Sequence, residues 1–311
     1  MKLFTTFLAI SLIISTLSAG QPSVLAHSNS PHRQKGGSIE DAIIDAVGVA
    51  VPLGKEAVRS LVKPILDTVT ITPQQEMQIG NQFFQNIKKK LGSKLDRDQR
   101  EVAYVTSIGN VLATNVKRKG IKYKFHVVED RLPNAFAIAG GHVFIYRGLL
   151  ETVIENEAQL AAVIGHEISH VDAEHTVDFY KPVVAASQLP FADVSVLIAA
   201  LGSKLLTFSY SEVQESEADN LGTVLAFKAG YEPAEGKNMQ QRLGSLKSTG
   251  ATDPLTGLAD TVFRTHPPSQ KRAAAIDALS KKLHTQKPNQ KTYVGEANYR
   301  QRIPMTQKIL E

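Results

Sequence analysis

The residues with the clearest chemical meaning are His166, Glu167 and His170, which stand in the order His-Glu-Ile-Ser-His. On a helix, two histidines four positions apart lie one turn apart on the same face. Both imidazoles could therefore bind one Zn²⁺ at about 2.0–2.1 Å, while Glu167 on the flank accepts a proton from a water at the metal. A solvated helix face without a metal is the alternative, because the motif also arises by chance.

A catalytic zinc site requires a third protein ligand and an open position for water. The metzincin pattern would place a histidine at position 176, but the chain has Thr176, and His175 is out of register. Glu174, with Asp178 beyond it, is a second candidate. It lies one turn past His170 and cannot fold back to the same ion. The third ligand is therefore expected on another element.

The acidic segment 215–219, Glu-Ser-Glu-Ala-Asp, offers this third ligand on a separate helix. Glu215 would complete a site of two histidines and one glutamate, a combination that catalytic zinc uses. Asp219 lies one turn further on the same face and could orient a ligand imidazole through its second ring nitrogen. Glu217 points elsewhere and is expected at the surface. A salt-bridged helix face is the alternative for the two candidate residues.

Helices must hold these residues in place. One helix over about 155–175 carries the His-Glu motif, and the apolar run 160–164 predicts that it is buried. A second helix over 212–228 carries the acidic segment. Thr72 and Pro73 have the residue types of an N-cap and a first helical turn, so another helix begins there. Apolar periodicity predicts two more helices, over 98–115 and 267–282.

The signal for β-structure is confined to the middle of the chain. Residues 123–128 alternate like a half-buried strand, and the segments 136–139 and 142–146 flank a pair of glycines that suits a hairpin. We expect an α+β, mostly helical fold with a small antiparallel sheet. The second hairpin strand is the segment to which an extended substrate is expected to add. It consists of His142, Val143, Phe144, Ile145 and Tyr146.

The first residues have the features of a secretory signal. Lys2 precedes an uncharged apolar run to about Leu17, which is shorter than a membrane span of about 20 residues, and small residues follow. We predict a signal peptide over 1–26, cleaved after Ala19 or Ala26, with an uncleaved anchor as the alternative. The chain has no cysteine, which excludes a lipid-modified cysteine and any disulfide. The protein is therefore expected in the periplasm or cell envelope.

Composition is that of a globular protein, with 311 residues, 42% of them hydrophobic and 21% charged. The formal net charge is +5, and the lysine clusters have no interleaved aromatic residues, which argues against nucleic-acid binding. Solvated helix ends explain these clusters, with weak peripheral attraction to anionic membranes as the alternative. The apolar segment 183–206 predicts a buried helix or a membrane-facing flap. We divide the mature chain into a flexible start with helices (27–71), a main domain (72–285) and a tail (286–311).

Several motifs together resemble one peptidase family. Besides the segments 166–170 and 215–219, they are Asn134-Ala135-Phe136, Gly141, Gly148-Leu149-Leu150 and Thr265-His266-Pro267-Pro268. Over about 72–283 the chain resembles the gluzincin metallopeptidases of the HtpX, BepA and Oma type. The resemblance implies a zincin-like fold with one Zn²⁺ per chain, bound by His166, His170 and Glu215. It makes Glu167 the general base and Asp219 a support for a ligand.

The resemblance also implies a role for His266, because the corresponding histidine of relatives approaches the metal and either stabilises the transition state or blocks the resting site. Arg272 is expected to steady that loop. The chain resembles a minimal, soluble, exported member of the family. The implied activity is hydrolysis of peptide bonds in unfolded or misfolded envelope proteins. A zinc-stabilised chaperone or assembly factor with latent proteolysis is the alternative, and a zinc hydrolase of non-peptide substrates is a weaker one.

Overall fold

The computed structural model describes residues 60, 64, 68–187, 209–248, 266 and 269–307. The predicted signal peptide, the flexible start that follows it and residues 188–206 of the apolar segment lie outside these ranges. None of the helices in the described ranges combines the length and apolar character that crossing a membrane requires.

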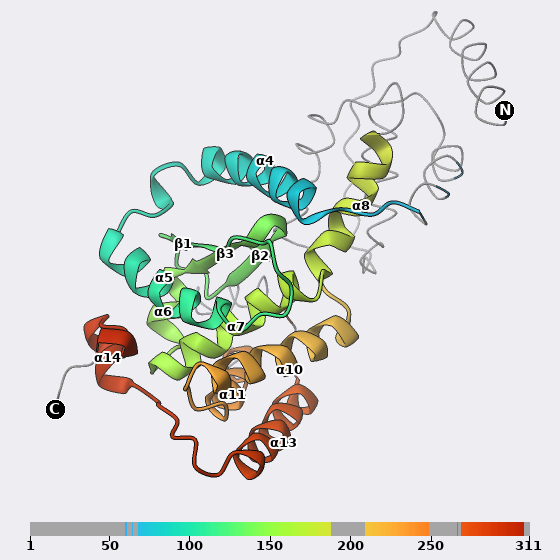
Figure 1. Cartoon of the computed structure of the whole chain (residues 1–311). Helices are drawn as coiled ribbons and strands as arrows, with labels where there is room; N and C mark the ends of the chain where they lie inside the picture. Colours follow the sequence, from blue (N-terminus) through green and yellow to red (C-terminus); the bar gives the residue numbers. More distant parts are fainter. Residues whose placement is uncertain are drawn as a thin grey trace, which may run out of the picture. The chain divides into compact units, whose positions relative to one another are not determined.

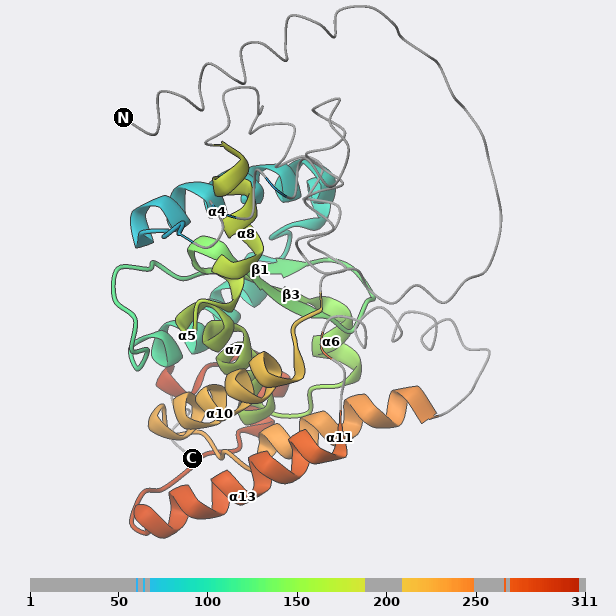
Figure 2. The ribbon, with the colours of Figure 1, turned by 90° about the vertical axis from the view of Figure 1, so that its right-hand side faces the viewer.

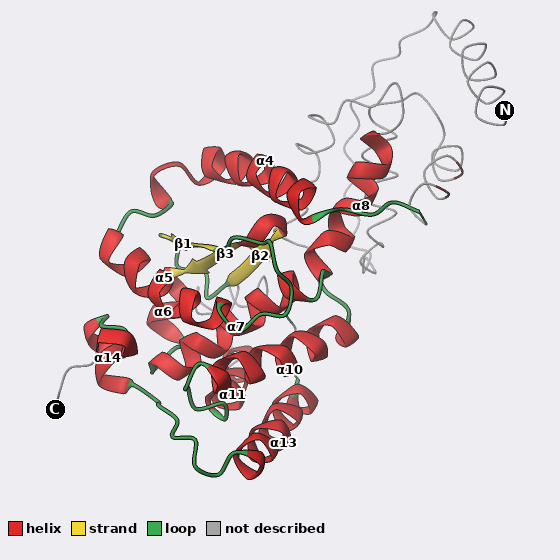
Figure 3. Ribbon diagram, in the orientation of Figure 1, coloured by secondary structure: helices red, strands yellow, loops and turns green. Residues whose placement is uncertain are grey.

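Helices make up most of the described chain, and a small sheet lies among them (Figures 1 and 3), which confirms the predicted fold class. The helices are α4 (Pro73–Leu91), α5 (Gln99–Ala113), α6 (Arg147–Thr152), α7 (Glu157–Asp172), α8 (His175–Ser187), α10 (Glu212–Lys228), α11 (Glu235–Ser248), α13 (Gln270–Gln286) and α14 (Glu296–Gln301). The strands are β1 (Lys124–Val128), β2 (Ala135–Ile138) and β3 (His142–Tyr146).

Local sequence explains where two of these helices begin. The Thr72 hydroxyl accepts a hydrogen bond from Gln75 N at 3.3 Å, and the Gln75 side chain accepts one from Thr72 N at 2.9 Å. This capping box satisfies backbone donors that a helix start leaves without partners. Ser211 and Gln214 form the same arrangement at the start of α10. The predicted helix starts at both places are confirmed.

The three strands form a mixed sheet in the order β1-β3-β2. β2 and β3 are antiparallel, as the predicted hairpin requires, but β1 and β3 are parallel. The prediction of a wholly antiparallel sheet is therefore wrong for β1. Alternating side chains fix the two faces of a strand but not its direction, and here the loop 129–134 carries the chain past the position that β3 later fills.

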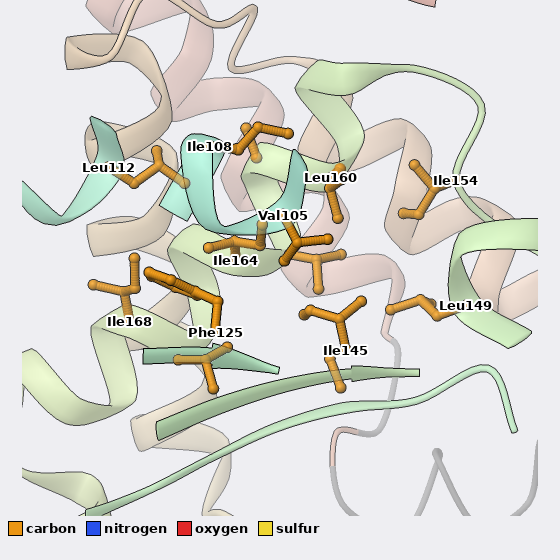
Figure 4. Close-up of a cluster of buried hydrophobic side chains, with 14 of the residues drawn as sticks. Val105, Ile108, Leu112, Phe125, Ile145, Leu149, Ile154, Leu160, Ile164 and Ile168 are labelled. Atoms are coloured by element: carbon orange, nitrogen blue, oxygen red, sulfur yellow. The ribbon is translucent and has the colours of Figure 1, made fainter. Parts of the chain in front are cut away.

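The hydrophobic core lies between the sheet and the helices α5 and α7 (Figure 4). α5 contributes Val105 and Ile108, and α7 contributes Leu160 and Ile164, all of them fully buried. Strand side chains at every second position, such as Ile145, complete this cluster from the sheet. α4 covers the opposite face of the sheet (Figure 1). The core thus fixes α7, the helix that carries the His-Glu motif, against α5 and the sheet.

The predicted helix over about 155–175 is confirmed as α7, but it ends three residues earlier than predicted and a separate helix, α8, follows it. α7 ends at Asp172, and Glu174 adopts a left-handed backbone with φ 63°. α8 then begins at His175 in a new direction. A residue with a left-handed backbone interrupts the hydrogen bonds of a helix. The spacing of apolar residues does not reveal such a single backbone angle.

Residues 287–307, which belong to the predicted C-terminal tail, pack against the main domain. Met305 N donates to the Glu157 carboxylate at 2.8 Å, and Ala158 N donates to Val294 O at 3.0 Å. α14 lies against α7, and α11 and α13 run alongside each other below α10 (Figure 2). The C-terminal segment therefore holds the N-terminal end of α7.

Candidate metal centre

The close crossing of α7 and α10 brings the two candidate ligand segments together. Gly165 of α7 and Gly222 of α10 face each other, and a Cβ on Gly222 would lie 2.7 Å from His166 N. Only a residue without a side chain allows this approach. Gly222 lies about two turns after Glu215 on α10, so the crossing sets the distance of that carboxylate from α7.

Three candidate ligand residues converge at this crossing. His166 Nε2 lies 3.1 Å from His170 Nε2, and Glu215 Oε1 lies 3.4 Å from His170 Nε2. Glu215 Oε2 lies 3.7 Å from His166 Nε2. Two ligands at about 2.0–2.1 Å from a tetrahedral zinc are separated by roughly 3.3 Å. The three buried residues therefore offer donors of the type and spacing that zinc requires.

His266 joins the same group, because one donor atom from each of the four residues lies within 4.8 Å of the others. His266 Nδ1 is 2.8 Å from Glu215 Oε1 and 3.3 Å from His166 Nε2. Burial lowers the pKa of His266, but the carboxylates of Glu215 and Glu167 outweigh it and raise the pKa to about 9. Without a metal, His266 therefore carries a proton at neutral pH.

Glu167 lies beside this cluster with one oxygen facing His266 Nε2 at 3.6 Å. Its other oxygen, Oε2, is buried and has no hydrogen-bond partner in the described part of the chain. A buried carboxylate oxygen without a partner is costly, so it calls for an explanation, such as a catalytic role or a bound water or ion. The position fits a general base that waits for a water or a substrate.

Asp219 and Arg272 support the cluster from behind. Asp219 Oδ1 lies 3.0 Å from His166 Nδ1, although the alignment of these atoms falls short of a hydrogen bond. Arg272 Nη1 lies 2.6 Å from Glu215 Oε2. Burial raises the pKa of Asp219, but Arg272 and His166 hold it below the usual range. Burial likewise raises the pKa of Glu215, but its three histidine neighbours outweigh this effect and hold the pKa below the usual range. Both carboxylates are therefore ionised and ready to hold cations.

Three residues that the sequence did not assign to the site also reach it. His175 Nδ1 lies 3.0 Å from His170 Nδ1, and His175 Nε2 lies 3.4 Å from Glu217 Oε2. The ring of Tyr210 stacks on that of His170 with centroids 3.7 Å apart. Glu217 is exposed at the surface, as expected, but one of its carboxylate oxygens contacts His175 behind the site. The left-handed Glu174 turns His175 back toward α7, which a continuous helix would not do.

The segment His142 to Tyr146 is β3, the central strand of the sheet. Both of its edges are paired, with β1 on one side and β2 on the other. The prediction that an extended substrate adds to this strand is therefore wrong, because its main-chain groups already bond to its neighbours. The hydrophobic pattern identified the strand but not its place in the sheet.

Comparison with known proteins gives a consistent result. The family model described as peptidase family M48 matches residues 99–280. The chain is 30% identical over 182 residues to metalloprotease LoiP of Escherichia coli, a match that covers 55% of this chain and 68% of LoiP. It is 32% identical over 163 residues to mitochondrial metalloendopeptidase OMA1 of Schizosaccharomyces pombe, covering 50% and 46% of the two chains. It is 27% identical over 190 residues to the beta-barrel assembly-enhancing protease of Yersinia pestis, covering 56% and 38%. The matched region thus spans less than half the length of OMA1 and of the beta-barrel assembly-enhancing protease.

Proposed function

Because the chain belongs to peptidase family M48, whose members are metallopeptidases, we propose that it is a zinc-dependent endopeptidase of unfolded or misfolded envelope proteins. One observation carries the proposal. His166, His170 and Glu215 present donors at zinc spacing beside Glu167, a buried carboxylate with an unpartnered oxygen. A site with three protein ligands and a neighbouring base is the arrangement of catalytic zinc.

The chain's own residues divide the chemistry between them. When bound, zinc supplies a Lewis acid that polarises the scissile carbonyl and acidifies water. Glu167 takes the proton of the attacking water and delivers it to the leaving amine. His266 lies next to Glu167 and, as a proton donor, can stabilise the oxyanion that develops. Asp219 orients the imidazole of His166.

In this proposal the substrate pairs with the outer edge of β2, and not with β3 as the sequence predicted. In the described part of the chain, no strand pairs with the outer edge of β2, whereas the outer edge of β1 meets Leu95. β2 also lies against α7, the helix that carries His166 and His170. An added strand binds through its main chain, which requires an extended and therefore unfolded segment of the substrate.

The envelope is proposed as the compartment on two grounds. The predicted secretory signal directs the chain out of the cytoplasm. The name of one relative, beta-barrel assembly-enhancing protease, links that protein to the assembly of β-barrels. Unfolded envelope polypeptides are therefore the proposed substrates and partners.

The decisive experiment incubates the purified mature protein with casein, with and without a chelator, and identifies products by mass spectrometry. We expect new termini that appear with zinc, vanish with chelator and return when stoichiometric zinc is restored. Intact casein after incubation with the fully zinc-loaded protein would reject the proposal.

One observation supports a second candidate, a zinc-stabilised chaperone or assembly factor with latent proteolysis. His266 Nδ1 lies among the candidate ligand atoms, so four protein donors could close the site. Four protein ligands are typical of structural zinc. This candidate predicts that chelation lowers the melting temperature while the wild-type protein cuts nothing, and that His266→Ala releases proteolysis.

A further inference from the structure

We infer that His175 and Glu217 form a hydrogen-bonded relay behind His170 that fixes the tautomer of this ligand. The inference rests on the proposed function, because it takes His170 Nε2 as the atom that faces the metal. His175 and Glu217 are then positioning residues of the metal centre, acting through His170 without touching metal or substrate.

The backbone places His175 at the rear of His170. Glu174 turns the chain with its left-handed backbone, and His175 begins α8 with its side chain directed back to α7. The turn is held in place because Arg118 Nε contacts Glu174 Oε1 at 3.2 Å and Arg118 Nη1 donates to Val171 O at 3.1 Å. His175 itself is buried, with 4% of its surface exposed.

The positions of the nitrogen atoms assign the protons. His170 Nδ1 and His175 Nδ1 lie 3.0 Å apart, so one of them carries the shared proton and the other accepts it. His170 Nε2 faces His166 and Glu215 and must offer its lone pair to a cation, which leaves the proton of His170 on Nδ1. His175 Nδ1 therefore accepts this proton.

Glu217 favours the same proton positions through the second ring nitrogen of His175. A neutral His175 that accepts at Nδ1 carries its own proton on Nε2, and this atom lies 3.4 Å from Glu217 Oε2. A carboxylate accepts such a proton but cannot donate one when ionised. Glu217 thus favours the tautomer of His175 that in turn favours the ligand tautomer of His170.

The two histidine ligands then have matching support. Asp219 lies at the second nitrogen of His166, and Glu217 acts on the second nitrogen of His170 through one intervening imidazole. The stacked ring of Tyr210 further limits rotation of His170. All three acidic residues of the segment 215–219 would therefore serve the metal centre, although one of them is half exposed.

The relay is tested through zinc affinity, measured by competition with a chromophoric chelator. His175→Leu removes the acceptor, and we expect zinc to bind about 10–100-fold more weakly, as for other groups that orient metal ligands. His175→Asn keeps an acceptor where Nδ1 stood and should recover most of the affinity. Glu217→Gln should weaken binding by a smaller factor, whereas the matched control Glu212→Gln, on the exposed first turn of α10, should change nothing.

A second measurement does not depend on zinc. Nitrogen-15 spectra of the metal-free wild-type protein should place the proton of His175 on Nε2 and that of His170 on Nδ1. Urea unfolding of each metal-free variant establishes that it is folded. The relay would be overturned if His175→Leu bound zinc as tightly as the wild-type protein, or if His175→Asn bound zinc as weakly as His175→Leu. A proton on His175 Nδ1 would also overturn it. A wild-type protein that binds no zinc would instead reject the proposed function, and the spectra would still decide the proton positions.

Discussion

Arg272 donates two parallel hydrogen bonds to Asp219, from Nε to Oδ2 at 2.6 Å and from Nη2 to Oδ1 at 2.8 Å. Both side chains are buried, and the pair joins α13 to α10 directly behind the metal centre. The planar guanidinium matches the carboxylate with its fork of donors, which lysine could not do. The same guanidinium also contacts Glu215, so it balances the charge of two carboxylates.

Removal of this guanidinium should destabilise the fold. In Arg272→Gln, Asp219 and Glu215 stay buried without their cation, and breaking such a buried pair costs about 3–5 kcal/mol. We expect a loss of this order in the free energy of unfolding of the metal-free protein, measured with urea. Lys271→Gln, an exposed neighbour, is the matched control. A loss below about 1 kcal/mol would mean that Arg272 is not the main counter-charge.

A methyl group at the helix crossing should weaken zinc binding. In Gly222→Ala the new Cβ would meet His166 N at 2.7 Å, so α10 must move away from α7 and carry Glu215 with it. We expect a loss of about 1–3 kcal/mol in unfolding free energy, together with weaker zinc binding. Gly244→Ala on α11 is the control, because its Cβ meets no atom of the described chain. It should stabilise the protein by up to about 1 kcal/mol. Unchanged zinc affinity in Gly222→Ala would show that the crossing does not set the ligand distance.

The sequence predicted the site better than the sheet, and the reason is physical. His166 and His170 are related by helical geometry, which is local, and Glu215 follows from what zinc requires of a third ligand. The place of β3 in the sheet depends on which strands it meets, and no local pattern contains that information. His175 was missed because its position depends on one backbone angle, at Glu174.

Acid should destabilise the protein partly through His142. Burial, together with His126 and Lys124, lowers the pKa of His142 from 6.5 to about 3. Its ring is bound by His126 on one side and Asn81 on the other, 3.0 Å away in each case, and it stacks on Phe84. Between these two pKa values the unfolded chain binds a proton that the folded chain does not. The free energy of unfolding therefore falls as the pH drops below about 6.5, by at most about 1.4 kcal/mol per pH unit for this group.

Urea unfolding at pH 7.5, 6.0 and 5.0 measures this slope. His142→Asn should give a flatter pH dependence than the wild-type protein, because the group that titrates is gone. Gln241→Asn, a change at an exposed position that removes no ionisable group, should keep the wild-type slope. Equal slopes in all three proteins would remove His142 from the acid response.

Glu167→Gln should separate binding from catalysis. The amide keeps the shape of the side chain but cannot take a proton, and loss of a general base costs about 10²–10⁴-fold in rate. We expect one zinc per chain by elemental analysis and casein cleavage reduced by this factor. Glu212→Gln, at the exposed start of α10, should retain both properties. Wild-type cleavage by Glu167→Gln would assign the base to another residue.

Pairing of the substrate with β2 makes a prediction about the substrate itself. In an antiparallel edge pair, only every second residue of the added strand directs its N–H toward the partner strand. A peptide methylated on these backbone nitrogens cannot form the pairing, whereas methylation of the intervening nitrogens leaves it intact. We therefore expect kcat/KM to fall in one of two alternately methylated peptides and to remain near that of the parent peptide in the other. Equal losses in both peptides, or no loss in either, would show that substrates bind without adding a strand to β2.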